Sequence, residues 1–384
     1  MHNTFLLFLP LFSAFEINTR EPILPDETVT VTIQNGTVKG RVIRNSNDEK
    51  IDRFLSIPFA QPPTGNLRFK NPEPASSWKP LTYNAAGPAS TSISWLRDRM
   101  CLQQLITPVI YGTEDCLYLH LWRPNKFSDK LPVLIWIYGG AFELGSADGV
   151  TLFQQHWYHM DNLAGKGVIC VGINYRLGPL GFLKVENSTI NGNFGLYDQE
   201  MAINWVYENI EAFGGDKSKI TVMGQSAGAA STAVQIRNPR LEGKISQGIL
   251  LSGTHSAPWA TNTENWAKQQ ADELLLKIGC DNEECLREAD GKELVGAVLN
   301  VDLRDLLSRA DTMGFTIKWA PVIDDVIHFD ENNELAQKIS DQKRIIIGHT
   351  DSDAYFTTSA NMPRLWLNSS GFQLDPVDEK YWQI

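Results

Sequence analysis

The sequence predicts an α/β protein with a mainly parallel central sheet flanked by helices. From about residue 130, short apolar runs that are typical of buried strands recur along the chain. Segments with apolar residues at helical spacing lie between these runs. Parallel strands need crossover connections, which are usually helices. The alternation therefore favours a parallel sheet with both faces covered.

The predicted elements follow in order along the chain. Residues 29–33 and 37–43 alternate between apolar and polar side chains near Gly and Asn, which predicts an antiparallel sheet at the start. The predicted buried strands are residues 131–138, 168–173, 220–223, 249–251 and 344–347. The predicted helices lie around residues 202–210, over 227–236, and from Thr263 to Gly279. Beyond residue 355 the pattern fades and predicts loop and short helix.

Composition limits the functions that this chain can have. Its 384 residues are 42% hydrophobic and 21% charged, and no repeat or linker interrupts residues 16–384, so we expect one domain there. The net charge of −11 disfavours binding to nucleic acid and to anionic membranes. No stretch approaches the roughly 18 apolar residues of a spanning helix, so we expect no transmembrane segment.

Residues 1–15 have the pattern of a secretory signal peptide. Residues 5–12 form a short apolar run, and the small residues Ser13 and Ala14 follow it. No Lys or Arg precedes the run, so an uncleaved apolar tail is the alternative. Three Asn-x-Ser/Thr sequons fit a secreted glycoprotein, and their asparagines are Asn35, Asn187 and Asn368.

The five cysteines bear on the compartment. Cys170 lies in the apolar run 167–173, which predicts a buried free thiol. The local pairings of the other four are Cys101 with Cys116 and Cys280 with Cys285, and both would indicate an oxidising compartment. A zinc site is the alternative, but the two pairs lack two-residue knuckle spacing and a histidine pair.

The sharpest motif is a Gly-x-Ser-x-Gly turn centred on Ser226. It follows the predicted strand 220–223 and opens a helix rich in small residues. Such a turn lifts the serine oxygen above the sheet edge, and Gly224 and Gly228 let strand and helix pass closely. The N–H of Ala227 then points from the helix N-terminus at a developing oxyanion. Ser226 is the predicted nucleophile, and a tight turn with an idle serine is the alternative.

A second glycine turn supports this interpretation. The predicted strand ending at Tyr138 leads directly into Gly139, Gly140 and Ala141, so backbone with few side chains is exposed where the strand ends. The N–H groups of Gly140 and Ala141 are therefore further candidate oxyanion donors. An ordinary glycine turn is the alternative.

Motifs from about residue 33 to residue 356 resemble the type B carboxylesterase and cholinesterase family of α/β-hydrolases. The resemblance implies an α/β-hydrolase fold and hydrolysis of a small-molecule carboxylic ester through an acyl-enzyme, without cofactor or metal. It also implies the roles given above for the serine and the oxyanion donors, and the two local disulfides. The matching segments, besides the serine turn, are 54–69 (FLSIPFAQPPTGNLRF), 114–119 (EDCLYL), 174–178 (NYRLG), 192–199 (GNFGLYDQ), 213–216 (FGGD) and 257–260 (APWA).

The resemblance also implies the position of the triad acid. In the family the acid lies five residues after a Gly that ends a strand, and here Gly348 places it at Asp353, where Glu is more usual. Either carboxylate can orient a histidine. Asp351 in the same loop is the second candidate. The alternative to a catalytic role is a solvated acidic turn.

The triad histidine has no counterpart in the expected order. The order in this fold is serine, acid, histidine, and no His follows Asp353. His255 and His349 follow predicted strands but precede the acid in the chain. The family continues for roughly a hundred residues more, so we expect that the C-terminal part of the fold is missing, that apolar sheet surface is exposed, and that activity is weak or lost.

The sequence gives some information about the substrate class. Cholinesterases hold a quaternary ammonium over a tryptophan between the first two cysteines, and residues 102–115 contain no Trp. A general carboxylesterase is therefore expected. Trp259 matches an acyl-pocket residue, with a core aromatic as the alternative. The competing functions are a non-catalytic, neuroligin-like adhesion protein and a non-functional truncated isoform, and the sequence predicts no oligomeric state.

Overall fold

One mixed sheet organises the protein. The computed structural model describes residues 27–87, 99–104, 109–149, 158, 160–297, 317–330, 332–350 and 353. In these residues the strand order is β1-β2-β3-β7-β9-β8-β10-β11-β12, and β4 pairs with β2 beside it. Its strands are β1 (Thr28–Ile33), β2 (Gly36–Arg44), β3 (Lys50–Pro58), β4 (Thr82–Asn84), β7 (Tyr118–Pro124), β8 (Leu131–Ile137), β9 (Ile169–Ile173), β10 (Gly215–Gln225), β11 (Gln247–Leu251) and β12 (Arg344–Gly348). A separate pair consists of β5 (Gln103–Gln104) and β6 (Ile110–Tyr111).

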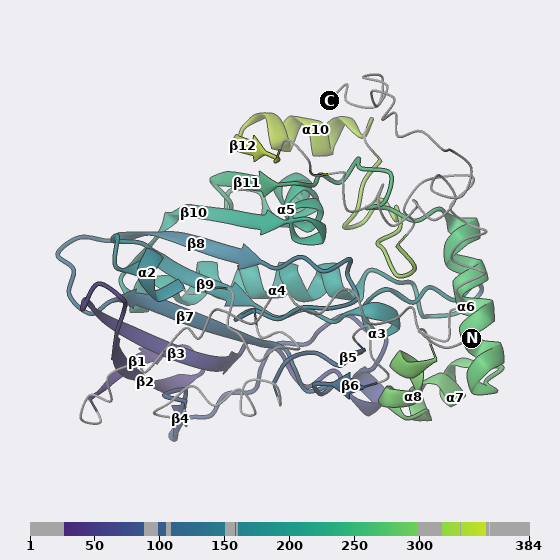
Figure 1. Cartoon of the computed structure of the whole chain (residues 1–384), viewed down its shortest axis with the longest axis horizontal. Helices are drawn as coiled ribbons and strands as arrows, with labels where there is room; N and C mark the ends of the chain where they lie inside the picture. The colour runs from purple at the N-terminus through teal and green to yellow at the C-terminus, as the bar shows by residue number, and fades with distance from the viewer. Residues whose placement is uncertain are drawn as a thin grey trace, which may run out of the picture.

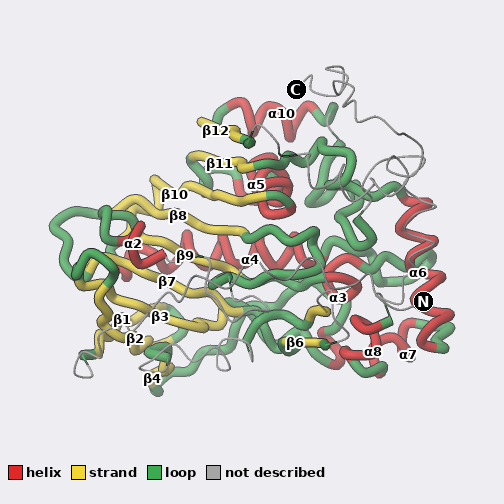
Figure 2. Tube along the Cα trace, in the orientation of Figure 1, coloured by secondary structure: helices red, strands yellow, loops and turns green. Residues whose placement is uncertain are grey.

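The sheet has an antiparallel and a parallel part. The pairings β1–β2, β2–β3, β3–β7 and β7–β9 are antiparallel. The short strand β4 pairs parallel with β2 beside them. From β9 onward all pairings are parallel, through β8, β10 and β11 to β12. Figure 2 shows these strands as one continuous twisted band. The predicted α/β architecture with an antiparallel entry sheet is confirmed.

Burial explains which strands lie at the centre. Every residue of β9 is buried, as expected for an apolar strand covered on both faces. Strand β10 begins five residues before its predicted start, because its first half is polar and the apolar pattern misses it. At the end of the sheet, Ile345, Ile346 and Ile347 of β12 are 39%, 64% and 55% exposed, so this edge presents apolar side chains.

The helices pack along the sheet and at the end toward which its parallel strands run. Helix α5 contacts β10 and β11, and α4 contacts α5 and β10. Figure 1 shows α6, α7 and α8 gathered at the end of the molecule opposite β1 and β2. The helices are α2 (Met160–Ala164), α3 (Gly178–Phe182), α4 (Phe194–Asn209), α5 (Ala227–Arg237), α6 (Glu264–Ile278), α7 (Glu283–Glu288), α8 (Gly291–Gly296) and α10 (Glu334–Asp341), with short 3₁₀ turns at Gly65–Leu67, Ile210–Phe213 and Pro239–Leu241.

Helix α6 has the predicted ends. The Thr263 side chain accepts a hydrogen bond from the Trp266 N–H at 3.2 Å, which caps the first turn. Gly279 ends the helix in the left-handed conformation, with φ of 69°.

Among the described helices, none combines the length and the apolar character that crossing a membrane requires. Residues 1–15, Asp351 and Asn368 lie outside the described residues.

Candidate active site

Ser226 occupies a strained turn between β10 and α5. Its φ of 55° and ψ of −124° are uncommon for a residue with a side chain. The strain is held by the surrounding backbone: the Ser226 N–H donates to the Leu251 carbonyl at 2.8 Å, and its own carbonyl accepts from Ala229 and Ala230 at 2.9 and 3.0 Å. The side chain is therefore presented at the carboxyl end of the parallel sheet, as the sequence predicts.

Glycines allow this close crossing of strand and helix. A Cβ on Gly224 would collide with the Gly228 carbonyl, and a Cβ on Gly228 would collide with the Ile137 carbonyl. These obstacles are backbone atoms, which cannot move aside without shifting the sheet. A Cβ on Gly253, after β11, would lie 2.5 Å from the Ser226 carbonyl. The ends of β8 and β11 thus enclose the Ser226 turn on two sides.

The loop after β8 lies against the serine. A Cβ on Gly139 would be 3.1 Å from the Ser226 Cβ, so this backbone directly adjoins Ser226. Gly140 and Ala141 follow with φ of 122° and 55°. Ala227 is fully buried as the first residue of α5. The structure therefore brings the three predicted oxyanion donors to the region of Ser226, on two backbone segments.

Two stacked tyrosines support the loop from beneath. The rings of Tyr138 and Tyr175 are 4.5 Å apart with an interplanar angle of 21°. The Tyr175 hydroxyl donates to the Tyr138 carbonyl at 2.9 Å, and the Tyr138 hydroxyl donates to the Tyr175 carbonyl at 3.1 Å. Both side chains are fully buried. This reciprocal pair fixes the backbone immediately before Gly139, and the sequence pattern does not reveal it.

The same loop carries a partly buried acid, Glu143. Glu143 accepts a hydrogen bond from the Trp319 N–H at 3.4 Å, which joins the loop to residues 317–322. Burial raises the pKa of Glu143 to about 7, although the Trp319 N–H and the nearby Lys318 charge act in the opposite direction. A carboxyl group that changes charge near neutral pH therefore lies two residues from Ala141.

Asp353 lies after β12, beside the end of β11. Strand β11 is the next strand in the chain after Ser226. Its Oδ1 accepts from the Thr350 hydroxyl at 2.9 Å, and its N–H donates to the Thr350 carbonyl at 3.2 Å. Partial burial would raise the pKa of Asp353, but hydrogen bonds from the side chains of Ser252 and Thr350 outweigh it, so the pKa lies below its usual range. Ser252 follows β11, and its N–H donates to the Gly348 carbonyl at 2.8 Å. The sequence analysis misses Ser252, whose only signal is its place at a strand end.

The candidate histidines have different surroundings. His349 is exposed and its charge acts on Asp353. His255 is half-buried, and burial together with Arg237 and His328 lowers its pKa to about 4. His328 contacts the Thr261 hydroxyl through Nε2 at 2.7 Å. In the described part of the chain, no three His, Cys, Asp or Glu side chains gather as metal ligands would.

Trp259 lies close to the nucleophile turn. Its ring would be 3.2 Å from a Cβ on Gly253, the residue that packs on the Ser226 carbonyl. The indole is partly exposed. Its role in an acyl pocket stays a prediction.

The two cysteine pairs are bonded as expected. Cys101 is bonded to Cys116 and Cys280 to Cys285, with Cα atoms 4.9 and 5.5 Å apart. Cys170 is a buried free thiol, and burial raises its pKa to about 12.

Arg68 connects the two segments that hold the disulfides. Its Nε and Nη2 donate to the two carboxylate oxygens of Glu114 at 2.7 and 2.6 Å. Its Nη1 donates to the carbonyls of Arg287 and Ala289 at 2.7 and 2.6 Å. One guanidinium thus joins the loop between Cys101 and Cys116 to the end of α7.

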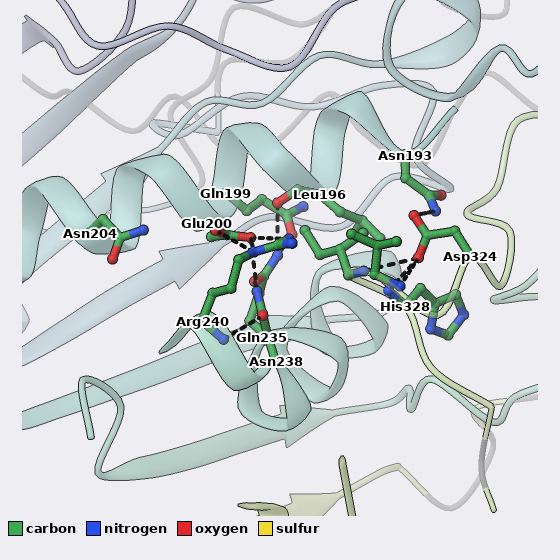
Figure 3. A network of polar contacts seen from close by, with 12 residues as sticks. Asn193, Leu196, Gln199, Glu200, Asn204, Gln235, Asn238, Arg240, Asp324 and His328 are labelled. Carbon is green, nitrogen blue, oxygen red and sulfur yellow. Dashed lines mark hydrogen bonds and ion pairs between the residues drawn. The ribbon is translucent and has the colours of Figure 1, made fainter. Parts of the chain in front are cut away.

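A polar network fixes the helices behind the serine turn (Figure 3). Asn193, before α4, donates to Asp324 at 3.0 Å. Gln235 of α5 donates to the Leu196 carbonyl at 2.8 Å and to Gln199 at 3.3 Å, both on α4. Because α5 begins directly after Ser226, these buried contacts hold the serine turn in position relative to α4.

Comparisons with known proteins agree with this geometry. The model of the carboxylesterase family matches residues 27–377. Bile salt-activated lipase of Bos taurus is 35% identical over 351 residues, covering 88% of this chain and 54% of that protein. Cholinesterase of Mus musculus is 35% identical over 280 residues, covering 70% of this chain and 45% of that protein. A solved thermophilic PNB esterase superposes with a TM-score of 0.70 at 30% identity, covering 85% of this chain and 64% of that one.

The comparison by sequence and the comparison by structure therefore agree on the same kind of protein. The chain spans about half the length of these curated relatives. The match nonetheless includes the serine turn, the glycine loop after β8 and Asp353 after β12. This chain belongs to the carboxylesterase family.

Proposed function

We propose that this protein is a carboxylic ester hydrolase with Ser226 as nucleophile. The observation that carries the proposal is the strained conformation of Ser226 at the carboxyl end of the sheet, directly against the Gly139 backbone. Strain of this kind persists only where the surroundings enforce it, and it is typical of functional sites. An adhesion surface has no use for it.

The proposed reaction proceeds through an acyl-enzyme. The Ser226 hydroxyl oxygen attacks the ester carbonyl carbon while a base takes the hydroxyl proton. The carbonyl oxygen becomes an oxyanion that the N–H groups of Gly140, Ala141 and Ala227 stabilise. Collapse of the intermediate breaks the ester C–O bond and releases the alcohol, which receives the proton. Water then attacks the acyl-enzyme by the same route and releases the acid.

The base is the unassigned part of this proposal. Asp353 is proposed as the acid that orients it, because hydrogen bonds keep this carboxylate ionised. His255 and His349 are the candidates among the described residues, and both precede the acid in the chain. Without a triad histidine, the oxyanion hole and binding leave roughly 10³- to 10⁴-fold acceleration over water. We therefore expect weak turnover from these 384 residues.

The substrate class is proposed to be an uncharged carboxylic ester. The Cys101–Cys116 loop offers no tryptophan for a quaternary ammonium group. A secretory location is proposed as well, because both disulfides need an oxidising compartment.

The test combines a fluorophosphonate probe with p-nitrophenyl acetate hydrolysis. We expect slow probe labelling of the purified chain that Ser226→Ala abolishes. His255→Ala and His349→Ala, made separately, show which histidine acts, since only that variant loses labelling. A folded chain that never labels at Ser226 would contradict the esterase proposal and favour the neuroligin-like binding role.

A further inference from the structure

Two sequon asparagines lie in the described residues, and Asn187 is the accessible one. It is exposed at the tip of a turn, with φ of 55°, a conformation that asparagine tolerates. The turn is closed by the Lys184–Asn191 bridge and by a hydrogen bond from the Val185 N–H to the Ile190 carbonyl at 2.9 Å. No described residue forms a hydrogen bond with the Asn187 side-chain amide, which faces solvent.

The side-chain nitrogen and the backbone carbonyl of Asn35 both form hydrogen bonds. Its Nδ2 donates to the carbonyls of Ala75 and Ser76 at 3.0 and 3.5 Å. Its backbone carbonyl accepts from the Trp78 N–H and the Ser77 hydroxyl, both at 2.9 Å. The side-chain nitrogen therefore points at the carbonyls of residues 75 and 76, and an attached sugar would replace at least one of the hydrogens that make these contacts.

We propose that the folded protein carries an N-linked oligosaccharide on Asn187 and none on Asn35. The proposal rests on the secretory location proposed above. The amide nitrogen of Asn187 attacks the anomeric carbon of an oligosaccharide carried on a lipid diphosphate. The new C–N bond forms as the C–O bond to the diphosphate breaks, the amide loses one proton, and the lipid diphosphate leaves.

The third residue of the sequon sets the time of this modification. The Thr189 hydroxyl donates to Glu283 at 2.5 Å, and the Thr189 N–H donates to the other oxygen of the same carboxylate at 2.5 Å. Arg287 donates to the Thr189 hydroxyl at 3.2 Å. These partners lie on α7, which follows the sequon by 94 residues. During synthesis Thr189 has not yet met Glu283, and once α7 docks its hydroxyl is hydrogen-bonded to that carboxylate. Transfer of the oligosaccharide therefore precedes docking of α7.

Site-resolved mass spectrometry tests the proposal. The full chain is expressed in cells with a eukaryotic secretory pathway, behind a heterologous cleavable leader, so that the result does not depend on residues 1–15. Peptide N-glycosidase treatment in heavy-oxygen water marks each formerly glycosylated asparagine as labelled aspartate. In the soluble, disulfide-bonded fraction we expect the label at position 187 and unlabelled Asn35. Asn187→Gln should remove this glycan, and the matched control Asn35→Gln should leave it in place.

Two results would overturn the proposal. One is an unlabelled Asn187 in cells that glycosylate a reference protein, and the other is a labelled position 35 in the folded fraction. For the timing, folded unglycosylated chain incubated with the transferase and its lipid-linked donor should stay unmodified, whereas reduced and unfolded chain should be modified at Asn187. Equal modification of both would refute closure by Glu283. Ser226→Ala should show the same glycan pattern, which separates this test from the esterase proposal.

Discussion

Replacing Glu143 by Gln should make the protein more stable at alkaline pH and leave it nearly unchanged at acidic pH. The folded protein raises the pKa of this partly buried carboxyl from 4.5 to about 7, so folding favours the neutral form. The stability that this preference contributes is complete below about pH 4.5 and is lost as pH rises through about 7. The glutamine amide oxygen can still accept the Trp319 N–H.

The size of the effect follows from the pKa difference. A tenfold change in a protonation constant corresponds to about 1.36 kcal/mol, so a rise from 4.5 to about 7 corresponds to about 3.4 kcal/mol. Glu143 is partly in contact with solvent, which reduces the expected gain at pH 8.5 to about 2 kcal/mol.

Urea unfolding followed by tryptophan fluorescence measures this difference at pH 4.5 and pH 8.5. The matched control is Glu73→Gln, which makes the same change at an exposed glutamate. Equal stability changes for Glu143→Gln at both pH values would refute the reasoning that burial opposes its ionisation.

Three further changes test the site. Gly228→Ala should lower the free energy of unfolding by at least about 2 kcal/mol, because its Cβ meets backbone. Gly348→Ala should cost little in the same urea titration, because its Cβ would meet only the Leu251 side chain, at 3.8 Å. Ser252→Ala should slow fluorophosphonate labelling about tenfold through Asp353, since a hydrogen bond to a charged group contributes about 1.5 kcal/mol; an unchanged labelling rate would count against Asp353 as the acid. Asp198 of α4 is buried and accepts hydrogen bonds from Nε and Nη2 of the buried Arg176 at 2.8 and 2.7 Å. Asp198→Ala should therefore destabilise the fold by about 3–5 kcal/mol in thermal unfolding, because it leaves the Arg176 guanidinium without its carboxylate.

The central strands could be predicted because their signal is local. Strands β8 and β9 are continuous apolar runs, and the glycines beside Ser226 announce a sharp turn within five residues. Contacts between distant segments leave no such pattern. The Tyr138–Tyr175 pair joins residues 37 positions apart, and Glu143 meets Trp319 across 176. Only the fold shows that these side chains meet, and so the place of Glu143 in the loop after β8 could not be foreseen.

Arg68 illustrates how geometry constrains sequence change. Two of its nitrogens donate to a carboxylate on one side, and the third donates to helix-end carbonyls on the other. A lysine would keep the charge but offers a single nitrogen, which cannot span both partners. A change to lysine at this position should therefore be rejected during divergence even though charge is conserved. The evolutionary tolerance of the position is set by the shape of the side chain.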